Sequence, residues 1–164
     1  MSFKNILTKI PEELQNEIIE MDVFLKAFRP LKFKRTVDKR KINYVASDYG
    51  ISYAILPLDS EPTQHFGWYY LYDKEAEKWY RKTDYFEETL IEIAKNNPSS
   101  AERIFNALNE CTLCKDHPCS AILYKHNDKQ KQACYGRTIL SLSNDGFNDT
   151  KAFFQSLNAL VGQE

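Results

Sequence analysis

Four cysteines lie close together in the second half of this chain of 164 residues, across positions 111–134. Three of them fall within nine residues and the last follows later: Cys111, Cys114, Cys119 and Cys134. A pair of cysteines separated by two residues is the usual first half of a zinc site, because both sulfur atoms can converge on one tetrahedral ion. Four thiolates would fill the coordination shell of the ion. The spacing therefore predicts one structural zinc ion per chain, not a catalytic one.

The register of the hairpin expected after the third cysteine determines the distance between Cys119 and Cys134. If Asn127 and Asp128 form a two-residue turn, Ala121 faces Cys134, and Cys119 lies diagonally across the same face. The Cα atoms of diagonal neighbours are about 7–8 Å apart, and their Cβ atoms are somewhat closer. A disulfide needs Cβ atoms about 3.5–4.5 Å apart, which is too close for this diagonal. An ion with Zn–S bonds of about 2.3 Å spans the wider gap more easily, so this register favours a metal site.

Other uses of these thiols stay open. They could form a disulfide or carry no metal, they could hold an iron–sulfur cluster, or His117 could replace one cysteine as a zinc ligand. A redox switch is disfavoured, because Cys111 falls on the last turn of its expected helix, where the helix dipole disfavours a thiolate.

Aromatic residues provide the second candidate site. Along one expected strand they alternate with other side chains, and two tyrosines on preceding strands could join them, giving the set Tyr44, Tyr53, Phe66, Trp68, Tyr70 and Tyr72. The simpler interpretation is a sheet face packed by helices as core. The functional interpretation is an aromatic-lined pocket for a planar or cationic ligand, since so many tyrosine hydroxyls would need partners in a dry core.

An enzyme would need other groups. His65 precedes the aromatic strand, and Glu87 and Glu88 open an expected helix, so a histidine and a carboxylate could supply general-base chemistry. Nothing in the sequence brings them together, and the chain has no glycine-rich phosphate loop or nucleophile motif. Binding is therefore a better expectation than catalysis.

Basic residues gather in the segment Lys32–Lys41, which contains Lys32, Lys34, Arg35, Lys39, Arg40 and Lys41. They could contact nucleic acid. However, the formal net charge of the chain is −1, and lysines also protect exposed sheet edges against aggregation. We expect an exposed edge with no nucleic-acid partner.

The composition is that of an ordinary globular protein, with 43% hydrophobic and 27% charged residues. No stretch approaches the roughly 20 apolar residues of a membrane-spanning helix, and from the composition of the first residues we expect no signal peptide. We expect a cytoplasmic protein.

The periodicity of apolar residues predicts the elements that would position these groups. Spacings of three and four indicate helices, and alternation indicates strands. The expected order is a helix at 11–29, antiparallel strands at 31–82, two helices at 84–111, a hairpin at 120–142 and a helix at 150–161. This order predicts a single α+β domain, with a meander sheet packed by N-terminal, central and C-terminal helices.

Together these patterns predict a zinc-stabilised domain that binds a small ligand on the aromatic face or binds a protein partner. An enzyme using His65 or nearby acids, or a protein that contacts nucleic acid through Lys32–Lys41, is the alternative.

Overall fold

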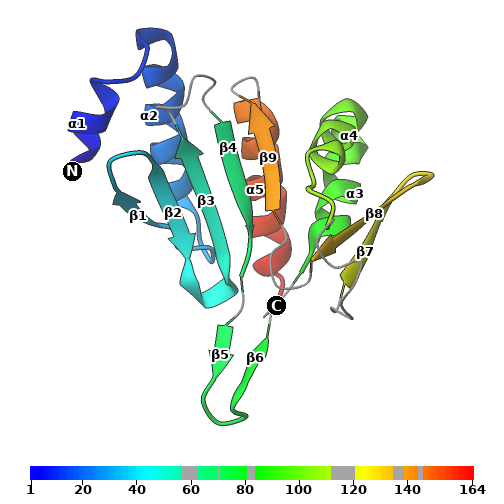
Figure 1. Cartoon of the computed structure of the whole chain (residues 1–164). Helices are drawn as coiled ribbons and strands as arrows, with labels where there is room; N and C mark the ends of the chain where they lie inside the picture. Colours follow the sequence, from blue (N-terminus) through cyan, green and yellow to red (C-terminus); the bar gives the residue numbers. More distant parts are fainter. Residues whose placement is uncertain (57–62, 70, 81–83, 112–120, 135–138, 144–145) are drawn as a thin grey trace.

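A computed structural model describes residues 1–56, 63–69, 71–80, 84–111, 121–134, 139–143 and 146–164. Within these ranges the fold is α+β, as predicted. Five helices accompany an antiparallel sheet of five strands and two separate hairpins (Figure 1).

The helices lie close to their predicted positions, with one addition and one correction. They are α1 (Phe3–Leu7), α2 (Glu12–Ala27), α3 (Phe86–Asn96), α4 (Pro98–Asn106) and α5 (Phe147–Val161). The short helix α1 was not predicted; its first turn is capped by the hydroxyl of Ser2, which accepts a hydrogen bond from the Asn5 N–H. Helix α4 starts with proline at its first position, and the side chain of Asn97 accepts a hydrogen bond from the Ser100 N–H. The correction is that α4 ends at Asn106, so Cys111 does not lie on its last turn as predicted.

The main sheet has the strand order β1-β2-β3-β4-β9, and each neighbouring pair is antiparallel. Its strands are β1 (Lys34–Val37), β2 (Ile42–Ala46), β3 (Ile51–Leu56), β4 (Thr63–Trp68) and β9 (Ile139–Ser143). The first four follow one another as the predicted meander. Strand β1 is therefore one edge of the sheet.

Two hairpins lie outside this sheet. One consists of β5 (Leu71–Asp73) and β6 (Lys78–Tyr80), and it projects from the rest of the molecule (Figure 1). The other consists of β7 (Ala121–His126) and β8 (Lys129–Cys134). The register of the second hairpin is the predicted one, with His126 opposite Lys129 and Ala121 opposite Cys134.

The predicted hairpin arm that ran to Leu142 is divided in the structure. Strand β8 ends at Cys134, and Ile139–Ser143 forms β9 beside β4 in the main sheet. The reason is packing: Leu140 and Leu142 are buried, and they join the core when β9 pairs with β4.

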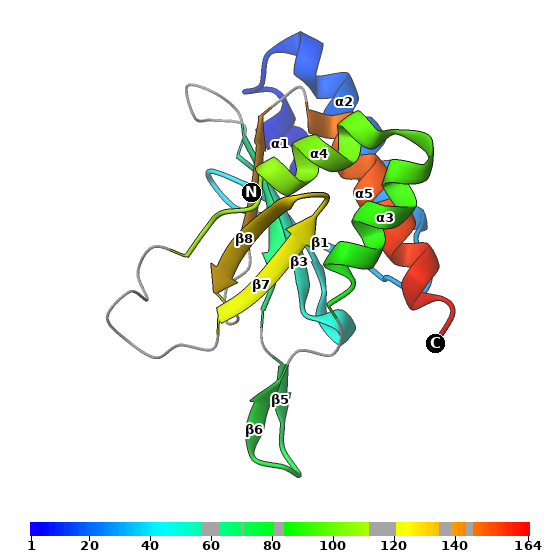
Figure 2. The same ribbon diagram turned by 90° about the vertical axis from the view of Figure 1, so that its right-hand side faces the viewer.

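The buried side chains form one cluster between the main sheet and its helices. Helices α2, α3 and α5 lie on one side of that sheet, which we call the core face (Figures 1 and 2). The opposite side, the open face, has no described helix packed on it (Figure 2). In the described part of the chain, no helix is long and apolar enough to cross a membrane.

Candidate functional site

Four of the six predicted ligand-binding aromatics lie on the core face. Their side chains are only 0–3% exposed; they are Tyr44, Tyr53, Phe66 and Trp68. Helix α5 covers the last three, and Tyr44 contacts Asp22 of α2. The ring of Phe66 lies 4.9 Å from that of Phe153 and 5.3 Å from that of Phe154. These four residues are part of the packed core and offer no surface to a ligand in this conformation.

The hydroxyl groups of the buried tyrosines find partners inside the protein. Tyr44 donates to a carboxylate oxygen of Asp22 at 2.9 Å, and Tyr53 donates to Oε1 of Gln64 at 2.8 Å. The Thr150 hydroxyl also donates to Oε1 of Gln64, at 2.9 Å. Burial raises the pKa of both tyrosines far above its ordinary value, and the Asp22 carboxylate raises that of Tyr44 further. Both hydroxyls therefore remain donors, and the core needs no ligand to satisfy them.

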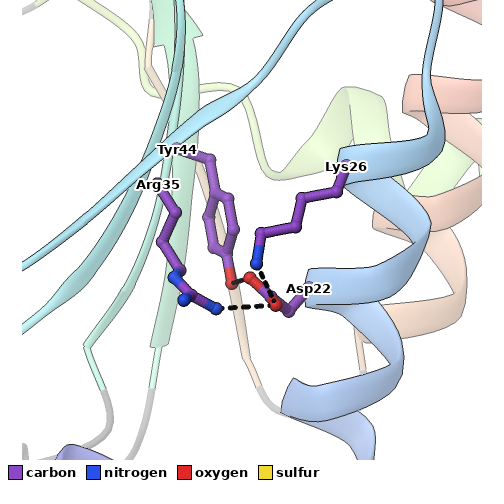
Figure 3. A network of polar contacts seen from close by, with 4 residues as sticks. All are labelled: Asp22, Lys26, Arg35 and Tyr44. Carbon is purple, nitrogen blue, oxygen red and sulfur yellow. Dashed lines mark hydrogen bonds and ion pairs between the residues drawn. The ribbon is translucent and has the colours of Figure 1, made fainter. Parts of the chain in front are cut away.

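Asp22 is the centre of a polar network that joins α2 to the sheet (Figure 3). Its carboxylate accepts hydrogen bonds from Lys26 at 2.8 Å, Arg35 at 2.7 Å and Tyr44 at 2.9 Å. Burial alone would raise the pKa of this carboxyl, but the three donors together lower it below its ordinary value. The guanidinium of Arg35 also lies 4.0 Å from the ring centre of Phe3, so the same network holds α1. Its role is structural.

Tyr72 has a different position from the buried aromatics. It lies on β5, not on the same strand as Phe66 and Trp68, and its side chain is 48% exposed. The main chain leaves the sheet after Trp68, where the Tyr69 N–H donates to the Gly50 carbonyl at 2.7 Å. The predicted continuous strand is thus wrong at this point. Tyr70, also predicted for the site, lies outside the described residues.

The prediction of a zinc site is wrong. Among the described residues, no group of three or more histidine, cysteine, aspartate or glutamate side chains could hold a metal ion. Cys111 and Cys134 are half-buried, whereas Cys114, Cys119 and the alternative ligand His117 lie outside the described ranges.

Other contacts join the end of α4 to the β7–β8 hairpin, which was the role expected of the metal. The Cys111 N–H donates to the carbonyl of Gln132 at 2.9 Å. The ammonium group of Lys131 donates to the carbonyls of Asn106 at 2.7 Å and Leu108 at 3.0 Å, which lie at and beyond the C-terminus of the helix. A lysine at this position satisfies carbonyls that the helix leaves without intrahelical partners.

His65 lies on the open face, in direct register with Ser141 of β9. Its Nδ1 is 2.9 Å from the Ser141 hydroxyl and its Nε2 is 3.2 Å from the Thr63 hydroxyl. The predicted acids are elsewhere, because Glu87 and Glu88 belong to α3 on the side of the core face (Figure 2). The contacts of His65 with these two hydroxyls do not indicate a general base paired with a carboxylate.

The basic segment forms the edge of the main sheet, as expected. Lys34 and Thr36 of β1 are exposed, while Arg35 and Val37 alternate with them and are half-buried. Arg35 is the member of the segment that enters the Asp22 network.

Sequence reasoning missed the polar groups inside the core. Besides Asp22 and Gln64, a third is Asp149 near the start of α5, which accepts hydrogen bonds from Ser100 and from two nitrogens of Arg103. Burial would raise the pKa of this carboxyl, but Arg103 and Ser100 together lower it. The available signal was an acid next to the apolar residues of a predicted helix, as at Asp22 beside Met21. That pattern does not show which residues, distant along the chain, donate hydrogen bonds to the carboxylate.

Comparison with known proteins gives no assignment, because no protein-family model, curated protein or solved structure matches the chain.

Proposed function

We propose that the protein is a binding domain for another protein and that its β5–β6 hairpin contacts the partner. The observation that carries this proposal is Tyr72, which is 48% exposed on a hairpin that projects from the molecule (Figure 1). Tyrosine is enriched at protein interfaces, because its rigid ring buries a large area and its hydroxyl forms hydrogen bonds at a low cost in conformational entropy.

The burial of the other aromatics supports a protein partner over a small ligand. The four buried aromatics could reach a ligand only if the helices on the core face moved away from the sheet, which would expose Phe153 and Phe154 of α5. A projecting hairpin, in contrast, can enter a partner's surface without disturbing the core.

The charges of the hairpin also favour a protein. Asp73, Glu75 and Glu77 alternate with Lys74 and Lys78, so the tip carries a slight negative excess. Anionic lipids and nucleic-acid phosphates both attract a positive excess, which is lacking here. A protein surface with an apolar pocket and a polar rim fits this mixture of charges and an aromatic ring.

The test compares Tyr72→Ala with a matched control, Ile91→Ala, which truncates a side chain on α3 that is 59% exposed. Wild type and both variants are immobilised, and the proteins they retain from extracts of the source cells are quantified. A partner kept by wild type and Ile91→Ala but lost by Tyr72→Ala is then purified and titrated. We expect Tyr72→Ala to weaken its binding by roughly tenfold or more. If all three chains retain the same proteins with the same affinities, the hairpin is not the binding surface.

A further inference from the structure

The two edge strands of the main sheet, β9 and β1, differ in whether another segment of the described chain covers them. At the β9 edge, Leu108 forms a bridge with Leu140, and the Ser141 N–H donates to the Ala107 carbonyl at 3.0 Å. The chain after α4 thus covers that edge. At the other edge, β1 pairs with β2 on one side, and no described strand pairs with it on the other side. An uncovered edge strand can accept another extended chain through its main-chain groups.

This uncovered edge carries a concentrated positive charge. Five exposed cations surround β1, namely Lys32, Lys34, Lys39, Arg40 and Lys41, and we call them with β1 the basic edge. Among the described residues, no carboxylate forms a salt bridge with any of the five. The carboxylate of Asp38 accepts hydrogen bonds from the main-chain N–H groups of Arg40 and Lys41, which shapes the turn. The basic edge therefore has charge that an acidic partner could neutralise.

Alternation along β1 specifies the pattern that such a partner needs. Lys34 and Thr36 are exposed on the open face, whereas Arg35 and Val37 are half-buried on the side of the core face. Arg35 already forms an ion pair with Asp22 at 2.7 Å, and its guanidinium lies 4.0 Å from the ring centre of Phe3. An added strand would place an acidic residue beside Lys34 and an apolar residue on the side of Val37, because directly opposed residues share a face.

We propose that the basic edge binds an extended acidic segment of a partner protein, which pairs with β1 as a sixth strand of the sheet. The lysines that favour this segment repel a second copy of the same basic edge, so one set of charges selects the partner and prevents self-association. Nucleic acid is a weaker candidate. The aromatic residue within the basic segment, Phe33, is only 8% exposed and cannot serve as a stacking platform for bases.

This surface is separate from the β5–β6 hairpin (Figure 1). The inference therefore goes beyond the function proposed above, and either proposal can fail without the other.

The test uses a blocked synthetic peptide, Glu-Val-Glu-Thr-Glu-Val-Glu, titrated into the full chain labelled with ¹⁵N. The control is the same peptide methylated on alternate main-chain nitrogens, which keeps its charge but removes strand pairing. We expect amide shifts concentrated in β1 and its flanks, and weaker binding at higher salt. We also expect roughly fivefold weaker binding for the methylated peptide and for Lys34→Glu, but unchanged binding for Lys74→Glu, an exposed lysine of the hairpin turn.

Three outcomes would overturn the inference. An absence of shifts at millimolar peptide means that the basic edge accepts no acidic strand. Equal binding of the two peptides means that charge alone attracts them, without pairing. Tighter binding of a single-stranded oligouridylate than of the peptide, lost in Lys34→Glu, would assign the basic edge to nucleic acid.

Discussion

The aromatic residues of β4 and the tyrosine of β5 belong to one alternating pattern in the sequence but to two different regions of the molecule. Phe66 and Trp68 are 2% and 3% exposed, whereas Tyr72 is 48% exposed. The side chains are chemically similar, so their surroundings make the difference. Strand β4 has β3 and β9 on its two sides and α5 over its face, while β5 pairs with β6.

This difference shows that alternation identifies a face but not the sheet to which the face belongs. The change of sheet occurs beside Gly50, which has a left-handed backbone (φ 64°) and accepts the hydrogen bond from the Tyr69 N–H. One region is therefore a core that stabilises the fold. The other is an exposed hairpin, which we propose as the binding surface.

The largest effect is expected from truncating the core aromatics. Phe66→Ala removes a ring that contacts Phe153 and Phe154, so it should lower the free energy of unfolding by about 3–5 kcal/mol. Urea denaturation followed by circular dichroism measures this. A loss below about 1 kcal/mol would mean that the face is not packed, and the ligand pocket would again be a reasonable hypothesis.

Gly50→Ala tests the junction between the two regions. A Cβ atom at this position would lie 2.5 Å from the main-chain oxygen of Tyr69, in a backbone conformation that alanine disfavours. We expect a loss of about 2–3 kcal/mol in the same measurement. Gly162→Ala is the matched control, since its Cβ would lie 3.3 Å from its nearest neighbour and its φ is −73°, so it should cost clearly less than Gly50→Ala. Equal effects at the two glycines would show that this junction is not strained by a side chain.

Asp22→Asn tests how the core accommodates a tyrosine hydroxyl. Losing the charge should cost about 1–2 kcal/mol at pH 7, because the partners Lys26 and Arg35 are partly solvated. The folded pKa of Asp22 is lowered, so its stabilisation is present above the unfolded pKa and is lost as the pH falls through the folded value.

The difference between wild type and Asp22→Asn should therefore shrink below about pH 4, measured by denaturation across a pH series. Glu20→Gln, at an exposed salt bridge with Lys151, is the control and should cost less than about 1 kcal/mol. A difference that grows as the pH falls would contradict the assigned direction of the pKa shift.

The smallest effect on stability is expected at the hairpin. Tyr72→Ala should change the free energy of unfolding by no more than about 0.5 kcal/mol, because its side chain lies outside the main core. A loss comparable to that of Phe66→Ala, in the same urea titration, would show that Tyr72 is a structural residue and would remove the basis for the proposed binding surface.

Local signals in the sequence were sufficient for much of the fold. Pro11 and the acids after it located the start of α2, and Asn127 with Asp128 fixed the register of the β7–β8 hairpin. These features depend on residues that are neighbours along the chain. The sequence therefore specified them without reference to the rest of the structure.

Contacts between distant segments could not be predicted in this way. Leu140 and Leu142 lie on a strand that pairs with β4, which is distant along the chain, whereas the sequence predicted that they would continue the hairpin arm begun by β8. The zinc prediction also depended on contacts between separate segments. The spacing of the cysteines indicates which thiols could converge, but it does not indicate that Lys131 already joins the hairpin to the end of α4.

Hydroxyl-radical footprinting of the tyrosines, read by mass spectrometry, most directly tests the division between a closed aromatic core and an exposed hairpin. We expect rapid modification of Tyr72 and strong protection of Tyr44 and Tyr53, which are both 0% exposed. On unfolding in urea, all three should react at similar rates. If Tyr44 and Tyr53 react in the native protein as fast as Tyr72, the core face is open to solvent and the division is wrong.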